Sequence, residues 1–512
     1  MKSNLFFTPF GCNFFNTLSL ISILENAEKK HQAGEEVGIV YCDGQKGMTC
    51  WSNMSGNRLH CKLCKLYWHN LSSFLPLTVQ LIPISSLIKE TDIYAKGIDL
   101  NYNSVHDIKQ IEYKKSKIGY AAYSTYLTYS RNLYPALDQK FRKYFDKLLR
   151  QGALYTDLAL LVIEKYNPDN VAVYNSRIIY SRPIVDVCID QKRHFTCFET
   201  TFSTNNEITI TCFEDSMVHD VRNITERVYN CWNSDTIPIE KKVEIAEQFF
   251  VKRRNAIPAG DVVYIKDQKP GRLPENWNSE KKNILILNSS EDEYASLGEE
   301  HEKNTLFSSQ YEGIKYIIET CKDNKDIHIY LRIHPNLKDI TFQYHLKLYE
   351  LAKISDNITI ISPSSDISTY ALIDAAEKVV VFASTTGTES VFWNKPVIQL
   401  SYSDYSLLNI CYTPKTTEEL NELLSMHLEP KDKLGALQYA YYLLNDEYEE
   451  YELYKINRVY IKLFSLSMVL YNIEFPKQKW RKYIVFALMT IAKVLFLSKN
   501  NYPLNEDASS FS

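Results

Sequence analysis

A run of hydroxyl side chains around one glycine is the part of this sequence best suited to hold an anion. Segment 383–389 reads Ala-Ser-Thr-Thr-Gly-Thr-Glu, between an apolar run at 379–382 and a short stretch that ends before Pro396. The pattern predicts a buried strand, a tight turn and a short helix, whose N-terminal N–H groups favour an anion. The candidates for phosphate binding are Ser384, Thr385, Thr386, Gly387 and Thr388, with Glu389 as an acceptor for ribose or sugar hydroxyls. Alternatively, the hydroxyls only cap the helix.

An arginine and a histidine follow another predicted strand, at 327–333. Arg332 can pair with a phosphate through two nitrogens, and His334 can donate to a phosphate oxygen or protonate a leaving group. Because the carboxyl ends of parallel strands share one crevice, we expect both side chains to face the hydroxyl-rich turn. A loop histidine with its hydrogen bonds satisfied inside the protein is the alternative.

Charged residues also occur at predicted strand ends in the first half of the chain. A strand at 170–174 leads into Asn175 and Arg177, Arg182 begins a helix, and a strand at 195–198 ends at Glu199. Charges are costly to bury for packing alone. These residues therefore either line a cleft or pair with each other.

A group of cysteines follows the second predicted strand. Cys61 and Cys64 have the C-x₂-C spacing of a zinc knuckle, and Cys42 and Cys50 could complete a tetrahedral four-cysteine site. The sequence thus predicts a structural zinc, with free or redox-active thiols and an iron–sulfur cluster as alternatives. The eleven cysteines are scattered over a chain without secretion features, which indicates a reducing, cytoplasmic compartment.

The elements that must position these residues alternate between strand and helix. This rhythm predicts an α/β fold of two Rossmann-like domains. We assign 1–250 to a first domain with a cysteine-rich insertion at 42–64, 251–282 to a proline-rich connection, 283–429 to a second domain and 430–512 to C-terminal helices. With 512 residues and a net charge of −4, the chain is long enough for two domains and has no basic excess for nucleic-acid binding.

The C-terminal region contains an amphipathic stretch. Basic residues and Trp480 precede an apolar run at 483–497, and these fifteen residues are too few for a comfortable membrane-spanning helix. It suits a helix lying on an anionic membrane surface, here the inner face of the cytoplasmic membrane. A buried terminal helix is the alternative.

In its second half the chain resembles the bacterial capsular polysaccharide biosynthesis glycosyltransferases, a GT-B group that includes Kdo-transferase-like capsule proteins. The resemblance lies in Asn-Ser-Ser-Glu-Asp-Glu-Tyr at 288–294, Gln-Tyr-Glu-Gly-Ile at 310–314, Leu-Arg-Ile-His-Pro-Asn at 331–336, the turn at 383–389 and Lys-Pro-Val at 395–397. It extends more loosely to 174–177, 182–183 and Glu199, and so covers about 170–400. Where this chain has Ser176, the family more often has glycine.

The resemblance implies a nucleotide-sugar donor, CMP- or UDP-linked, in the second domain and a glycan or lipid-linked glycan acceptor in the first. Arg332 and His334 would meet the nucleotide phosphate, the 384–388 turn would hold phosphate, and Glu389 would hold ribose or sugar. The acidic loop with Glu291 and Glu293 would face the same cleft, together with Asn175, Arg177 and Arg182. No catalytic metal is expected, and Glu199 and Asp43 are the candidate bases. The alternatives are a sugar-nucleotide epimerase on the same fold and a non-catalytic, zinc-stapled scaffold of a glycan assembly complex.

Overall fold

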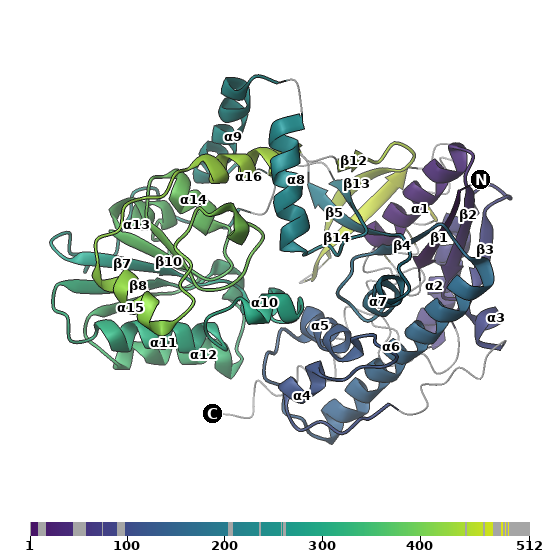
Figure 1. Ribbon diagram of the computed structural model, residues 1–512, viewed down its shortest axis with the longest axis horizontal. Helices are drawn as coiled ribbons and strands as arrows, with labels where there is room; N and C mark the ends of the chain where they lie inside the picture. The colour runs from purple at the N-terminus through teal and green to yellow at the C-terminus, as the bar shows by residue number, and fades with distance from the viewer. Residues whose placement is uncertain are drawn as a thin grey trace.

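The protein has two α/β lobes that lie side by side (Figure 1). The computed structural model describes residues 2–8, 17–44, 58–73, 75–89, 98–202, 208–234, 237–257, 259, 263–445, 448–463 and 466–474, with residues 483, 484, 487 and 490. Each lobe is built on its own mostly parallel sheet. The predicted fold class, α/β with two Rossmann-like domains, is confirmed.

The first domain contains a seven-stranded sheet of order β12-β6-β5-β4-β1-β2-β3. Its strands are β1 (Ser3–Thr8), β2 (Glu36–Tyr41), β3 (Gln80–Pro83), β4 (Asn170–Tyr174), β5 (Phe195–Phe202), β6 (Ile208–Glu214) and β12 (Tyr448–Glu450). Strands β1 to β5 pair in parallel, whereas β6 and β12 are antiparallel to their neighbours. The chain runs outward from β1 to β3 and then returns to place β4 beside β1, so the strand order reverses between β1 and β4.

Helices surround this first sheet. They are α1 (Thr17–Gln32), α2 (Arg58–Ser72), α3 (Ile84–Lys89), α4 (Val105–Lys109), α5 (Ile118–Ser130), α6 (Gln139–Tyr166), α7 (Arg182–Asp190) and α8 (Val221–Ser234). The helices α5 and α6 are rich in aromatic residues. Their tyrosines Tyr123, Tyr126 and Tyr155 are buried and belong to the core.

The second domain is built on five parallel strands in the order β11-β10-β7-β8-β9. The strands are β7 (Lys282–Leu287), β8 (Ile327–Arg332), β9 (Ile358–Ile361), β10 (Lys378–Val381) and β11 (Val397–Gln399). The helices are α10 (Glu299–Lys303), α11 (Gln310–Cys321), α12 (Gln343–Glu350), α13 (Thr369–Ala375), α14 (Thr386–Phe392) and α15 (Thr417–Ser425). The strands are almost continuously buried, as expected for a parallel sheet with helices on both faces. Here the strand order reverses between β7 and β10.

Two helices join the domains at the top of Figure 1: α9 (Ile239–Arg254) and α16 (Leu434–Asn445). Phe250 of α9 stacks on Phe392 of α14 with ring centroids 4.1 Å apart. On the other side, Trp232 of α8 packs edge-on against Tyr441 of α16 at 5.5 Å. After α16 the chain returns to the first sheet as β12.

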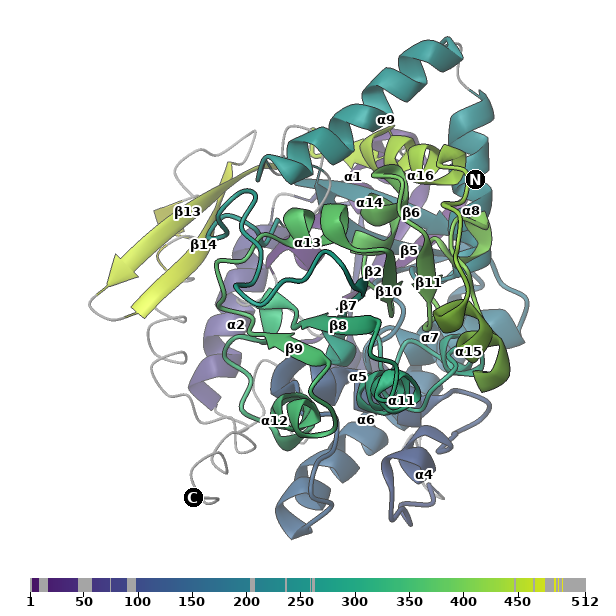
Figure 2. The same cartoon turned by 90° about the vertical axis from the view of Figure 1, so that its left-hand side faces the viewer.

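The prediction of C-terminal helices from residue 430 onward holds for α16 and is wrong for the described strands at 448–474. Residues after Asn445 form β12 and then an antiparallel hairpin of β13 (Lys455–Leu463) and β14 (Leu466–Glu474), which projects from the body in Figure 2. The hairpin sequence is rich in valine, isoleucine and tyrosine, which favour strands. Strand propensity therefore prevails in the hairpin, where helices were predicted.

The predicted membrane-surface helix at 477–497 falls almost entirely outside the described residues and stays a prediction. Within the described part of the chain, no helix has the length and apolar character needed to cross a bilayer.

Candidate functional site

A cavity of about 320 Å³ lies at the carboxyl ends of β7, β8 and β10. This is the edge at which the strand order of the second sheet reverses, where open α/β sheets place their ligands. Of the predicted site residues, those that line the cavity are Glu293, Arg332, His334, Ser384, Thr385, Thr386 and Glu389. The sequence therefore assigned residues from three separate loops to one site, and the structure brings them together.

The hydroxyl-rich turn follows β10 and leads into α14. Ser384 Oγ lies 2.7 Å from Thr386 Oγ1 and accepts the backbone N–H of Thr386 at 3.3 Å. The N–H groups of Gly387 and Thr388 donate to backbone carbonyls inside the turn. The turn thus holds its own shape and presents the side chains of Ser384, Thr385 and Thr386 to the cavity.

Two residues of the predicted phosphate loop do not line the cavity. Thr388 is buried and its hydroxyl donates to the carbonyl of Thr385 at 2.8 Å. A Cβ on Gly387 would collide with the hydroxyl of Tyr405, which donates to the Ser384 carbonyl at 2.5 Å. The glycine is therefore needed for the approach of Tyr405, not for the approach of a ligand, and this corrects the prediction.

Arg332 is fixed from both ends of its guanidinium. Its Nη1 donates to the carbonyl of Ser362 at 3.1 Å, and its Nη2 donates to that of Ser365 at 3.0 Å. Burial lowers the pKa of Arg332 to about 10, so the side chain stays cationic at neutral pH. The described residues offer its Nε no hydrogen-bond partner. A buried positive charge with one unused donor is what an anionic ligand would satisfy.

His334 has a defined tautomer. The backbone N–H of Asn336 donates to its Nδ1 at 3.2 Å, so the neutral ring carries its proton on Nε2. Burial, with the positive charges of Arg131 and Arg332, lowers the pKa of His334 to about 4. At neutral pH the ring therefore supplies an N–H donor. This agrees with the predicted role of His334 as a donor to a phosphate oxygen, whereas protonation of a leaving group stays a prediction.

Glu389 is held by two protein groups. Arg253 Nε donates to its Oε1 at 3.0 Å, and the hydroxyl of Tyr370 donates to its Oε2. The ion pair between Glu389 and Arg253 is buried, with side-chain exposures of 3% and 8%. The predicted contact of Glu389 with ribose or sugar would have to share these oxygens with Arg253 and Tyr370.

The sequence did not predict that the connection between the domains forms one wall of the cavity. Arg253 at the end of α9, Tyr264 and Gln268 all line the cavity. The Tyr264 ring lies 5.1 Å from the His334 ring, and Gln268 Oε1 accepts the N–H of Thr369 at 2.7 Å. No local pattern marks these residues, because only the path of the chain between the domains brings them here.

The predicted first-domain residues form a separate network at the point where its strand order reverses. Asn175 has a left-handed backbone with φ of +60°, and its Oδ1 accepts the N–H groups of Ser176 and Arg177 at 2.8 Å. Its Nδ2 donates to Glu199 at 2.6 Å, and the Tyr174 hydroxyl donates to the same carboxylate at 3.0 Å. Burial raises the pKa of Glu199. Glu199 does not line the second-domain cavity.

The other candidate base, Asp43, also lies outside the second-domain cavity. Its carboxylate accepts the N–H of Ser85 at 3.1 Å, after β2 in the first domain.

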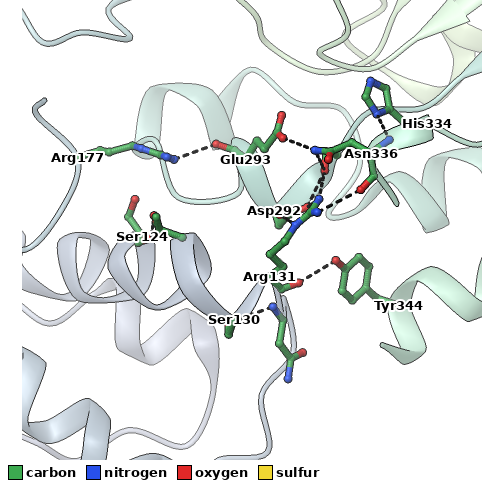
Figure 3. Close-up of polar contacts among 12 residues, drawn as sticks. Ser124, Ser130, Arg131, Arg177, Asp292, Glu293, His334, Asn336 and Tyr344 are labelled. Atoms are coloured by element: carbon green, nitrogen blue, oxygen red, sulfur yellow. Dashed lines mark hydrogen bonds and ion pairs between the residues drawn. The ribbon is translucent and has the colours of Figure 1, made fainter. Parts of the chain in front are cut away.

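Arg177 and Arg182 line a smaller cavity of about 170 Å³ between the domains, with His219 and His301. Arg182 pairs with Asp186 at 2.6 Å, and Arg177 Nη1 reaches the carbonyl of Glu293 at 3.0 Å (Figure 3). Of the two predicted alternatives, a cleft or mutual pairing, Arg177 and Arg182 thus follow the first and line a cleft.

The acidic loop divides its side chains between the cavity and the interior. Glu293 lines the second-domain cavity and accepts from Asn336 Nδ2 at 2.7 Å. Glu291 is turned away from it and accepts the N–H of Gln310 at 3.3 Å, and burial raises its pKa to about 7. Only one of the two predicted carboxylates of this loop therefore faces the ligand space.

The structure does not support the predicted zinc site. Cys61 and Cys64 lie one turn apart on the regular helix α2, not in a knuckle, and Cys42 follows β2. No three metal-ligating side chains gather anywhere in the described ranges, which include these three cysteines. Cys50 lies outside the described residues.

No protein-family model and no curated protein matches the sequence. Among solved structures, the chain is similar to the β-Kdo 2,4 transferase KpsC of Thermosulfurimonas dismutans, with 13% identity and a TM-score of 0.35 over 53% of this chain and 79% of that one. It is also similar to the UDP-GlcNAc 2-epimerase of Methanocaldococcus jannaschii, solved with UDP-GlcNAc and UDP, with 13% identity and a TM-score of 0.27 over 87% of this chain and 98% of that one. The spinosyn rhamnosyltransferase SpnG has 9% identity and a TM-score of 0.22 over 87% and 95%. Identities and TM-scores this low carry no argument about activity, so the function is argued from the site itself.

Proposed function

We propose that this protein is a glycosyltransferase that moves a sugar from a nucleotide-sugar donor, CMP- or UDP-linked, to a growing bacterial surface glycan. The observation that carries the proposal is the second-domain cavity. There a buried arginine, a neutral imidazole N–H and a hydroxyl-rich turn meet at the edge where the strand order reverses. Guanidinium, N–H and hydroxyl donors together suit phosphate oxygens.

The cavity also fits a donor in size and in the distribution of its polar groups. Its volume of about 320 Å³ falls within the usual range of small-molecule sites, roughly 300–1,000 Å³. Arg332, His334 and the 384–386 turn form one set of groups for the phosphates. The carboxylates of Glu293 and Glu389 are acceptors for sugar or ribose hydroxyls.

In this proposal the protein stabilises the leaving phosphate through fixed donors. Negative charge grows on the leaving group in the transition state, and donors that are already in place lower the barrier. Arg332 supplies the positive charge and His334 supplies a hydrogen bond from Nε2. The general base comes from the first domain, and Glu199 is the stronger of the two candidates because its raised pKa favours proton acceptance nearer neutral pH.

The acceptor site is proposed for the first domain and the space between the domains, where Asn175, Arg177 and Arg182 lie. A lipid-linked glycan would agree with attachment of 477–497 to the inner face of the cytoplasmic membrane.

A thermal-shift screen against CMP, UDP, GDP and dTDP tests the donor site. A ligand at a hundred times its dissociation constant adds about 2.7 kcal/mol of stability. We expect CMP or UDP to raise the melting temperature of the wild type, and His334→Ala to bind about tenfold or more weakly, since a hydrogen bond to a charged group contributes about 1.5–3 kcal/mol. No shift with any of the four nucleotides would contradict the proposal.

A second experiment with the same protein distinguishes a glycosyltransferase from an epimerase. Incubation with the matching nucleotide sugar should leave the sugar configuration unchanged when no acceptor is present. Interconversion of epimers without acceptor would favour the epimerase instead.

A further inference from the structure

Arg131 reaches from the first domain into the loops that form the donor cavity. It follows α5 with a left-handed backbone, φ +54°, and its N–H closes that helix on the carbonyl of Leu127. Its own carbonyl accepts the hydroxyl of Tyr344, from α12 of the second domain, at 2.8 Å. The backbone of Arg131 is therefore held from both domains, which directs its side chain across the boundary (Figure 3).

The guanidinium of Arg131 joins two separate loops of the second domain. Its Nε and Nη2 donate to the carboxylate of Asp292 at 2.7 and 3.3 Å, and Nη2 also donates to Ser290 Oγ at 2.7 Å. Its Nη1 donates to the carbonyl of Asn336 at 3.1 Å. Ser290 and Asp292 follow β7, whereas Asn336 follows β8. One planar side chain thus fixes the spacing between the two loops, which a lysine with a single nitrogen cannot do.

The loop after β8 carries His334, and the loop after β7 contacts it. The backbone N–H of Asn336 donates to His334 Nδ1 at 3.2 Å. The backbone N–H of His334, in turn, donates to Asn288 Oδ1 at 2.8 Å. The Asn336 amide also donates to Glu293 at 2.7 Å. The imidazole is therefore oriented by Asn336, and the position of Asn336 is set by Arg131.

We propose that Arg131 is a positioning residue for the donor site. When the domains are docked, it holds the loops after β7 and β8 in the spacing that keeps the His334 ring in place and its Nε2 proton available to the ligand. The inference rests on the proposed function for the identity of that ligand, but the arrangement of Arg131 and His334 can be tested without it.

The pKa of His334 gives a second way to test the role of Arg131, because the charge of Arg131 acts on the imidazole. The charged or titratable groups that face His334 are Arg131 from the end of α5, Arg332 from β8, Asp292 from the loop after β7 and Tyr264 from the connection. Arg131 and Arg332 disfavour protonation of the imidazole, and Asp292 favours it. Loss of Arg131 should therefore raise the pKa of His334, while a lysine at this position should largely keep it low.

The test compares Arg131→Ala and Arg131→Lys with Lys109→Met. Lys109 is the matched control, because it also crosses the boundary, to Glu302 at 2.5 Å and to the Ala295 carbonyl at 2.8 Å, without contacting the loop that carries His334. The His334 pKa is measured by NMR titration of histidine-labelled protein, with His334→Gln to assign the signal. The affinity for UDP and CMP is measured by calorimetry.

We expect Arg131→Ala to raise the His334 pKa above that of the wild type and to weaken nucleotide binding. The pKa should stay below the ordinary value of about 6.5, because burial and Arg332 still lower it. Arg131→Lys should keep the low pKa yet still lose about tenfold in affinity, because the fork to both loops is gone. Lys109→Met should change neither quantity. An unchanged His334 pKa and affinity in Arg131→Ala, or equal losses in Lys109→Met, would overturn the inference. If the wild type binds no nucleotide, the proposed function fails, and the NMR titration still decides the role of Arg131.

Discussion

At the scale of single residues, the second-domain cavity is lined by charged side chains whose partners lie within the protein. Glu389 and Arg253 are buried together, and the Tyr370 hydroxyl completes the group. A buried ion pair contributes little net stability when intact, but removing one partner leaves a charge without compensation. The carboxylate of Glu389 is thus held in one orientation before any ligand arrives.

The first prediction concerns this pair. Arg253→Met should destabilise the protein by about 3 kcal/mol or more, because the Glu389 carboxylate would remain buried without its cation. Adding Glu389→Gln to this variant removes the buried charge and should restore much of the loss. Urea unfolding of the two variants and the wild type measures the difference. A double variant as unstable as Arg253→Met would show that the charge of Glu389 is not the cause.

The residue scale also shows what a sequence can reveal about a site. Arg332, His334 and Ser384 could be predicted because each lies at or just after the end of a strongly apolar strand, and parallel strands place such residues at one edge. The tautomer of His334 and the reason for Gly387 could not, because they depend on Asn336 and Tyr405 contacts that only the folded chain forms. Arg253 and Tyr264 carry no local signal at all.

At the scale of elements, the turn between β10 and α14 depends on the close approach of Tyr405. The Tyr405 hydroxyl occupies the space of a Gly387 side chain and binds the Ser384 carbonyl. This contact anchors the loop after β11 against the turn that lines the cavity. The geometry of the hydroxyl-rich turn therefore depends on a loop more than fifteen residues further along the chain.

The second prediction tests this contact. Gly387→Ala should cost about 1–3 kcal/mol, the usual penalty for overpacking. Combining it with Tyr405→Phe, which removes the colliding hydroxyl, should cost less than the sum of the two single changes. Thermal unfolding of the four proteins gives the coupling, and strict additivity would mean that Tyr405 is not what requires the glycine.

The element scale also separates the strands that the sequence can predict from those it cannot. The five strands of the second sheet are short apolar runs between helical segments, so their pattern is local and readable. Strand β12 exists because it pairs with β6, more than two hundred residues earlier. Such a long-range pairing leaves no period in the local sequence, and the segment was therefore expected to be helical.

At the scale of the whole molecule, buried titratable groups link stability to pH. Burial lowers the pKa values of four histidines to about 4 (His60, His301 and His334) and about 3 (His219). Burial raises the pKa values of Glu291 and Asp404, to about 7 and about 6. These two shifts change the pH dependence of stability in the opposite direction to the histidines. In the folded protein the histidines resist protonation, whereas in the unfolded chain they take up protons below about pH 6.5.

The third prediction follows from that balance. Between about pH 6.5 and pH 4.5 the unfolded chain should bind about two more protons than the folded protein, so stability should fall by about 2.7 kcal/mol per pH unit as the pH drops. Urea unfolding at pH 7.0, 6.0 and 5.0 measures this slope. Equal or greater stability at pH 5.0 would show that the carboxylates outweigh the histidines.

The measurement that most directly tests the donor site is hydrogen–deuterium exchange with and without the nucleotide that stabilises the protein. We expect slower exchange in 263–268, 288–293, 332–336 and 383–389, the segments from both sides of the cavity, and no change in α2. Because these segments are separate in sequence and meet only at the cavity, joint protection would locate the ligand there. Protection confined to the first domain, or none in these four segments, would contradict the account.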